Sequence, residues 1–226
     1  MVKLIVDASQ FIHANWYICV KYEWDVIERV VDNIENEIFK LEQQAHIGSV
    51  VLALDSKPIF RTDIDPMYKN KPSSGIPIHE ITSALIDRFQ TLKCSGMEAD
   101  DIIYLYCARH TTSHQVIILS SDKDHMQTVE KTNAIQWCIR KGHIPNDGSW
   151  KYKIYLGCDS DGVPKSLAPR VGEKALLKVF PDVSSLKIDE ERLNLNKHLI
   201  EYSRELYEKH IPSADLFVLD QHIENR

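Results

Sequence analysis

Residues 3–7 have the sequence Lys-Leu-Ile-Val-Asp, a short apolar run that stops at a carboxylate. Two later runs have the same form, Val-Val-Leu-Ala-Leu-Asp at 50–55 and Gln-Val-Ile-Ile-Leu-Ser-Ser-Asp at 115–122. Short runs rich in branched residues are typical of strands buried on both faces of a sheet. We therefore predict three strands, each of which ends near an aspartate.

Segments with helical periodicity separate these runs. Residues 24–44 carry apolar side chains at three- and four-residue spacing, and similar patterns occupy 78–92 and 98–109. A short helix is predicted to begin near Glu173, and a broken helix is predicted over 189–209. The last three residues, 224–226, are expected to be frayed. Strands that alternate with helices predict an α/β fold, with a central, mostly parallel sheet covered by helices on both faces.

The composition is that of an ordinary globular protein. The chain has 226 residues, 43% hydrophobic and 27% charged, so we expect one domain over residues 1–226, acting as a monomer. No apolar run is long enough to cross a bilayer, and the first run meets a charge too early for a signal peptide. We expect a cytoplasmic protein without a membrane partner.

The five cysteines are scattered without a CxxC pair, which favours reduced thiols over disulfides or zinc.

Three aspartates follow the predicted strands: Asp7, Asp55 and Asp122. Open parallel sheets place their ligand crevice at the carboxyl ends of the strands, so these side chains are candidates for a shared site. The alternative is that each aspartate only caps the helix that follows it, because Asp is a preferred N-cap residue.

A second group of acids lies at the start of the helix predicted over 98–109. Glu98, Asp100 and Asp101 come directly before the apolar pair Ile102 and Ile103. Carboxylates that are adjacent near a core repel one another and require a counter-cation. An exposed acidic first turn is the alternative interpretation.

Further carboxylates occur as two closely spaced pairs, Asp122 with Asp124 and Asp159 with Asp161. So many oxygen ligands, without a His or Cys cluster at ligand spacing, favour Mg²⁺ or Mn²⁺ over zinc. Two such ions about 4 Å apart support in-line displacement at phosphorus. The pattern therefore predicts phosphodiester hydrolysis.

Seven segments occur in the order seen in structure-specific 5′-nucleases: residues 4–9, 54–57, 60–61, 67–71, 96–101, 121–124 and 160–164. The most specific are Gly-Met-Glu-Ala-Asp-Asp at 96–101 and Ser-Asp-Lys-Asp at 121–124. The chain resembles this PIN-like superfamily over about residues 1–180. It is most similar to the 5′-exonuclease, flap endonuclease and RNase H enzymes of bacteriophages and to the 5′-nuclease domain of bacterial DNA polymerase I.

The resemblance implies two Mg²⁺ (or Mn²⁺) ions. It assigns an inner ligand group, with Asp100 as the bridge, and an outer group: Asp7, Asp55, Glu98 and Asp100 are inner, and Asp101, Asp122, Asp124 and Asp161 are outer. Cys158 departs from the pattern, because it stands where the family has a ligand of the second ion. Either the neighbouring Asp159 replaces that ligand, or the second ion is held more weakly.

The resemblance also implies a helical arch over about 57–77 with nucleic-acid contacts. Lys69 would orient the scissile phosphate as a catalytic helper, with Tyr68, Arg61 and Lys71 as further nucleic-acid-binding residues. A solvated surface lysine is the alternative for Lys69 alone. Prolines and a glycine interrupt this stretch, so we expect a short arch, which leaves open whether a free 5′ end must thread it.

Residues 171–175, Val-Gly-Glu-Lys-Ala, resemble the start of the second helix in a helix-three-turn-helix element, here placed over about 157–180. Such an element grips the backbone of duplex DNA, which implies contacts from Arg170, Gly172 and Lys174 and a K⁺ ion bound by loop carbonyls. The loop is about two residues longer than in the family and lacks an expected glycine. An ordinary helix start is the alternative.

These features predict a 5′-nuclease acting on flap, nicked or RNA-primed DNA, including RNA·DNA hybrids, with a replication protein as a further partner. A non-catalytic homologue that binds branched DNA and a PIN-type ribonuclease are the alternatives. The net charge of −6 seems to oppose a nucleic-acid partner. However, without the nine acids of the proposed site, 24 acids stand against 27 lysines and arginines, so the rest of the chain is mildly basic.

Overall fold

The three apolar runs form the centre of one sheet. The computed structural model describes residues 1–70, 75–138 and 141–225. Strand β1 (Val2–Asp7) lies between β2 (Ile47–Ala53) and β4 (Gln115–Leu119) and pairs with both in parallel. Within these residues the sheet has the order β3-β2-β1-β4-β5-β6. The predicted α/β fold with a mostly parallel sheet is therefore confirmed.

Short strands complete both edges of the sheet. Strand β3 (Thr91–Leu92) pairs in parallel with β2, and β5 (Ile135–Cys138) pairs in parallel with β4. Strand β6 (Gly142–His143) is antiparallel to β5. The prediction of a helix through residue 92 was wrong, because that helix ends at Arg88 and the chain turns into β3.

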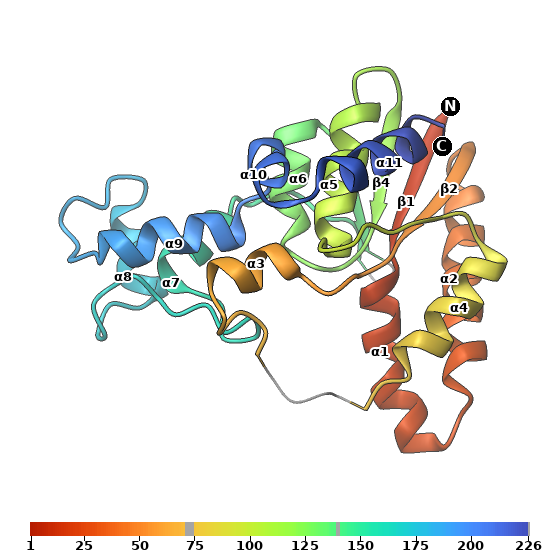
Figure 1. Ribbon diagram of the computed structural model, residues 1–226, viewed down its shortest axis with the longest axis horizontal. Helices are drawn as coiled ribbons and strands as arrows, with labels where there is room; N and C mark the ends of the chain where they lie inside the picture. The colour runs from red at the N-terminus through yellow and green to blue at the C-terminus, as the bar shows by residue number, and fades with distance from the viewer. Residues whose placement is uncertain (71–74, 139–140, 226) are drawn as a thin grey trace.

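Alternate side chains of β1 point to opposite faces, and different helices cover each face. Leu4 and Val6 pack under α1 (Ala8–Tyr22), α2 (Val26–Glu42) and α4 (Ile78–Arg88). Ile5 packs under α5 (Ala99–His110), α10 (Arg204–His210) and α11 (Ser213–Glu224). Helix α6 (His125–Thr132) lies beside α5 (Figure 1).

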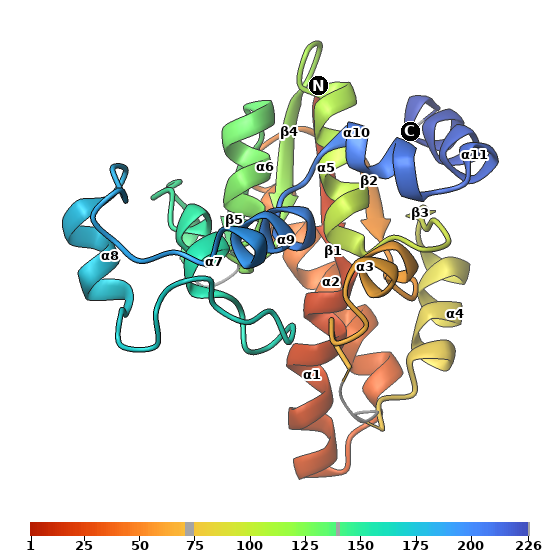
Figure 2. The ribbon, with the colours of Figure 1, turned by 60° about the vertical axis from the view of Figure 1, so that its left-hand side comes forward.

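Helices α7 (Trp150–Leu156), α8 (Glu173–Val179) and α9 (Glu190–Ile200) gather at one side of the sheet in both views (Figures 1 and 2). The predicted helix over 189–209 is indeed broken, because residues 201–203 separate α9 from α10. Of the residues predicted to fray, Glu224 is the last residue of α11, Asn225 follows the helix, and residue 226 lies outside the described part of the chain. Helices α1, α6, α7 and α11 were not predicted from the sequence.

The predicted arch region contains a core element. Helix α3 (Ile59–Ile64) buries Phe60 completely and leaves Arg61 only 2% exposed, so this part of residues 57–77 is not an excursion from the core. Residues 71–74, which include Lys71, lie outside the described part of the chain. Among the described residues, no helix is long and apolar enough to cross a membrane.

Candidate functional site

The aspartates at the strand ends converge on one edge of the sheet. Asp7 ends β1 and caps α1, because its Oδ1 accepts a hydrogen bond from the Gln10 amide at 3.1 Å. Its Oδ2 accepts another from the Ser120 hydroxyl at 2.8 Å. Asp55 follows β2 and accepts from the Ala99 amide at 2.7 Å. The capping role of Asp7 and its place in the site are therefore compatible.

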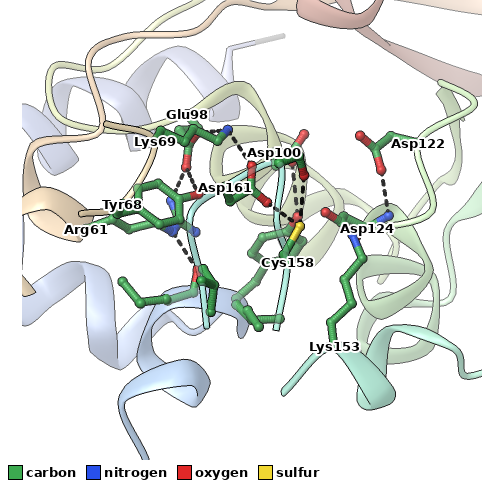
Figure 3. A pocket seen from close by; sticks show the side chains of 15 residues that line it. Arg61, Tyr68, Lys69, Glu98, Asp100, Asp122, Asp124, Lys153, Cys158 and Asp161 are labelled. Carbon is green, nitrogen blue, oxygen red and sulfur yellow. Dashed lines mark hydrogen bonds and ion pairs between the residues drawn. The ribbon is translucent and has the colours of Figure 1, made fainter. Parts of the chain in front are cut away.

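Two adjoining pockets open at this edge, and both are lined by Lys69, Glu98, Asp100 and Asp122. One also contains Asp7 and Asp55. The other, which Figure 3 shows, adds Asp124 at the start of α6, Lys153 of α7, and Cys158 and Asp161 of the loop after α7. The structure thus brings together the inner acids and three of the outer acids that the resemblance implied.

The protein balances the charge of Asp100 only in part. Burial raises its pKa well above the usual range; the charge of His125 opposes this rise, whereas Asp7 and Asp122 add to it. Burial likewise raises the pKa of Asp55. Carboxylates held together in this way favour a bound cation, and hard oxygen ligands suit Mg²⁺ or Mn²⁺.

Glu98 lies at the N-cap of α5, and its charge is already balanced by protein cations. Its Oε2 accepts hydrogen bonds from Arg61 at 2.9 Å and from the Tyr68 hydroxyl at 2.8 Å, and Lys69 pairs with its Oε1. Burial raises the pKa of Glu98, but the charges of Arg61 and Lys69 outweigh that effect, so the net pKa is lowered. Tyr68 is 6% exposed, so it supports Glu98 rather than offering a free ring to a base.

Asp101 is buried in an ion pair with Arg61, which also pairs with Glu98. Its two oxygens accept hydrogen bonds from Arg61, both at 2.6 Å, and Oδ1 also accepts from the Tyr207 hydroxyl at 2.9 Å. Asp101 is fully buried, and Arg61 nearly so. The assignments of Asp101 as an outer metal ligand and of Arg61 as a nucleic-acid contact therefore do not fit the structure, since each side chain satisfies the other inside the core.

Lys69 connects the end of the α3 segment to the loop after α7. Its backbone amide donates to the Asp161 carbonyl at 2.7 Å, and its ammonium lies 3.7 Å from Asp161 Oδ1. The Lys69 side chain remains 42% exposed at the pocket. It is thus the cation best placed to meet a phosphate there.

The outer side of the pocket is built around Cys158. Its thiol donates to Asp161 Oδ2 at 2.9 Å, and Asp124 pairs with Lys153 nearby. Asp159 is exposed and is not among the described residues that line either pocket. The geometry therefore places Cys158, and not Asp159, at the pocket wall.

The three residues assigned to duplex binding lie away from the pocket. Arg170, Gly172 and Lys174 are all exposed around the start of α8. In the same loop, the Lys165 ammonium donates to the carbonyls of Pro169 at 3.2 Å and Val171 at 2.8 Å. A cation of the protein itself thus occupies loop carbonyls of the kind that would bind K⁺.

His125 is a site residue that the sequence analysis missed, as are Lys153 and Tyr202, which contact Asp124 and Asp100 in the pocket. It is fully buried at the start of α6, with Nε2 3.2 Å from Asp7 Oδ2 and 3.5 Å from Asp100 Oδ1. Burial lowers its pKa, but the charges of Asp100 and Asp7 outweigh this and raise it to about 9. No local spacing reveals this contact, and the only sequence signal is that His125 directly follows Ser-Asp-Lys-Asp.

Comparisons with known proteins agree with this arrangement. The family model described as "5′-3′ exonuclease, N-terminal resolvase-like domain" matches residues 2–149. A curated 5′-3′ exonuclease of Mycoplasmopsis pulmonis (strain UAB CTIP) is 21% identical over 203 residues, covering 81% of this chain and 67% of that protein.

Solved structures with the same fold come from T5 proteins. The T5 D15 protein co-crystallised with metal ions superposes with a TM-score of 0.71 at 13% identity, covering 100% of this chain and 98% of that one. The bacteriophage T5 D15 flap endonuclease in a pseudo-enzyme-product complex with DNA and metal ions gives 0.69 at 15% identity, covering 100% and 97%. At these identities the likeness establishes the fold alone.

Proposed function

The chain belongs to the 5′-3′ exonuclease family and is a nuclease that hydrolyses phosphodiester bonds, and we propose that it cleaves flap, nicked or RNA-primed DNA with two Mg²⁺ or Mn²⁺ ions. The observation that carries this proposal is the group of carboxylates that line the two pockets around Asp100. Their mutual repulsion and burial fit divalent cations bound by oxygen ligands. The acids that would hold these ions are Asp7, Asp55, Glu98, Asp100, Asp122, Asp124 and Asp161.

When bound, the ions would supply activated water and stabilise the charge that develops on the phosphate. The residues of the chain position the reacting groups around them. Lys69 presents a partly exposed ammonium at the pocket, where it can orient a scissile phosphate oxygen by a charge-assisted hydrogen bond. Glu98 and Asp161 hold Lys69 in place before substrate arrives.

The supporting elements explain why this geometry is stable without substrate. Tyr68 and Arg61 fix Glu98, and the capping hydrogen bonds fix Asp7 and Asp55. Because these contacts preorganise the pocket, little reorganisation is required when a phosphate binds.

Duplex binding is proposed for the exposed residues Arg170, Gly172 and Lys174. Either a K⁺ ion or the Lys165 ammonium would order the carbonyls of that loop. Cleavage in KCl compared with NaCl at equal ionic strength distinguishes the two: K⁺ stimulation supports a bound ion, and equal rates support Lys165. A monomeric state and a replication-protein partner also remain proposals.

Purified protein tested on 5′-labelled flap, nicked duplex, RNA·DNA hybrid and single-stranded RNA decides the function. We expect cleavage of the first three substrates in Mg²⁺, none in EDTA, and none by Asp100→Ala. Product that persists in EDTA or in the variant would refute the two-metal proposal. Binding of branched DNA without cleavage in any divalent ion would favour the non-catalytic alternative, and cleavage of single-stranded RNA alone would favour the PIN-type ribonuclease.

A further inference from the structure

His125 introduces a nitrogen atom among oxygen ligands. Its Nε2 lies 3.2 Å from Asp7 Oδ2 and 3.5 Å from Asp100 Oδ1. Among the described residues, Asp7, Asp100 and His125 form the one group of three such side chains whose ligand atoms all lie within 4.8 Å of one another. The three side chains come from β1, α5 and α6, so this meeting depends on the fold and not on local spacing.

The spacing of the three atoms suits ligands of a single ion. Ligand atoms about 2.1 Å from a metal and at right angles to one another are about 3 Å apart. The two nitrogen–oxygen separations are close to that value. Figure 3 shows Asp100 among the side chains that line one pocket, and Asp7 and Asp100 both line the adjoining pocket.

The burial of His125 is a second, independent observation. The ring has no exposed surface, and its Nδ1 has no hydrogen-bond partner. A fully buried imidazole with one unsatisfied nitrogen is unfavourable unless the other nitrogen gains a strong interaction. The Nε2 atom lies beside Asp7 and Asp100, and these two carboxylates line the adjoining pockets.

We propose that His125 ligates the inner divalent ion through Nε2, together with Asp7 and Asp100, and that this site therefore prefers Mn²⁺ or a similar transition ion to Mg²⁺. The proposal rests on the proposed metal-dependent function and specifies its inner ion. Imidazole nitrogen binds first-row transition ions well, whereas Mg²⁺ prefers oxygen ligands and water. The competing explanation is that His125 only orients Asp7 by a hydrogen bond.

Pulsed electron paramagnetic resonance distinguishes the two roles. With one equivalent of Mn²⁺ bound to the full chain, a directly bound imidazole gives a ¹⁴N coupling that changes to the ¹⁵N pattern when histidine alone is ¹⁵N-labelled. We expect this coupling in the wild type and in His114→Gln, whose side chain is exposed, and its loss in His125→Gln. Its absence from the wild type would overturn the proposal, and this readout does not depend on the folding of any variant.

Calorimetric titration gives the matching selectivity. We expect the wild type to bind Mn²⁺ at least tenfold more tightly than Mg²⁺ and His125→Gln to lose most of that ratio, because glutamine keeps a hydrogen-bond donor but not the imidazole ligand. A ratio unchanged in a folded His125→Gln would assign His125 to orientation only. Flap cleavage in Mg²⁺ without any nitrogen coupling would reject this proposal and leave the proposed function intact. Nitrogen coupling without cleavage in any ion would support the ligand role of His125 and reject the proposed function.

Discussion

Asp100 and Asp101 are neighbours in sequence, yet their side chains enter opposite surroundings. Asp101 turns into the core, where Arg61 and Tyr207 satisfy it completely. Asp100 turns toward the pocket and keeps 30% of its side chain exposed, and the charge of His125, 3.5 Å away, does not offset its burial and the charges of Asp7 and Asp122. Asp101, Arg61 and Tyr207 thus form a closed cluster in the core, whereas Asp100 belongs to an open cluster of acids that line the pockets. Both clusters take a residue from the start of α5. The difference shows that a dense acidic motif can divide between holding the fold and holding a ligand.

The largest expected effect is a difference in cleavage activity between a variant of the open cluster and a variant of the closed cluster. Asp100→Asn should lower single-turnover flap cleavage in Mg²⁺ by on the order of 10⁴-fold, because it removes a charge from the metal pocket. Asp101→Asn should stay within about tenfold of the wild type per folded molecule, since its side chain does not line the pocket. Equal losses of cleavage activity in both folded variants would show that Asp101 acts as a metal ligand.

The next effect concerns stability, for which the substitution of Asp101 should cost more than the substitution of Asp100. Asp101→Asn should destabilise the protein by about 3–5 kcal/mol, because it removes the carboxylate that pairs with both ends of the buried Arg61 guanidinium and leaves only Glu98 to balance that charge. Denaturant unfolding measures this loss. The double variant Asp101→Leu with Arg61→Met is the matched control and should recover much of it. A double variant less stable than Asp101→Asn alone would show that the closed cluster stabilises the fold beyond balancing its own charges.

A smaller effect tests the outer wall of the open cluster. Cys158→Asp should raise Mg²⁺ affinity by up to about tenfold, because it places a second carboxylate beside Asp161, where the thiol now donates at 2.9 Å. Isothermal titration with Mg²⁺ measures the change, and Ser184→Asp, which adds a carboxylate at an exposed position that lines neither pocket, is the control. Lower affinity or rate with an unchanged fold would show that Cys158 does not occupy an incomplete ligand position.

The smallest effect concerns pH in EDTA. The folded protein raises the pKa of Asp100, so its ionised form destabilises the fold above the unfolded pKa of about 3.9. Asp100→Asn should therefore raise the melting temperature at pH 7–8 by roughly 2–4 °C. This advantage should shrink as pH falls through the folded pKa of Asp100 and protonates the wild-type side chain. An advantage that grows toward acid pH would contradict the sign of the shift.

The sequence predicted the parts of the site that depend on local pattern. Asp7, Asp55 and Asp122 follow apolar runs, and the order of strands in a parallel sheet brings such ends together. The roles of Asp101 and His125 could not be predicted in this way. Arg61 lies 40 residues before Asp101, and Asp7 lies 118 residues before His125, so both contacts arise only when distant helices pack on the sheet.

Thermal melts of the wild type, Asp100→Asn and Asp101→Asn, each with and without Mg²⁺, test the division of the acidic motif most directly. A ligand that binds only the folded state stabilises it by about 2.7 kcal/mol at 100 times its dissociation constant. Mg²⁺ should raise the melting temperature of the wild type. It should raise that of Asp101→Asn by a similar increment, although this variant melts at a lower temperature without Mg²⁺. The melting temperature of Asp100→Asn should stay nearly unchanged. Loss of the Mg²⁺ increment in Asp101→Asn, or its persistence in Asp100→Asn, would contradict the assignment of the two residues.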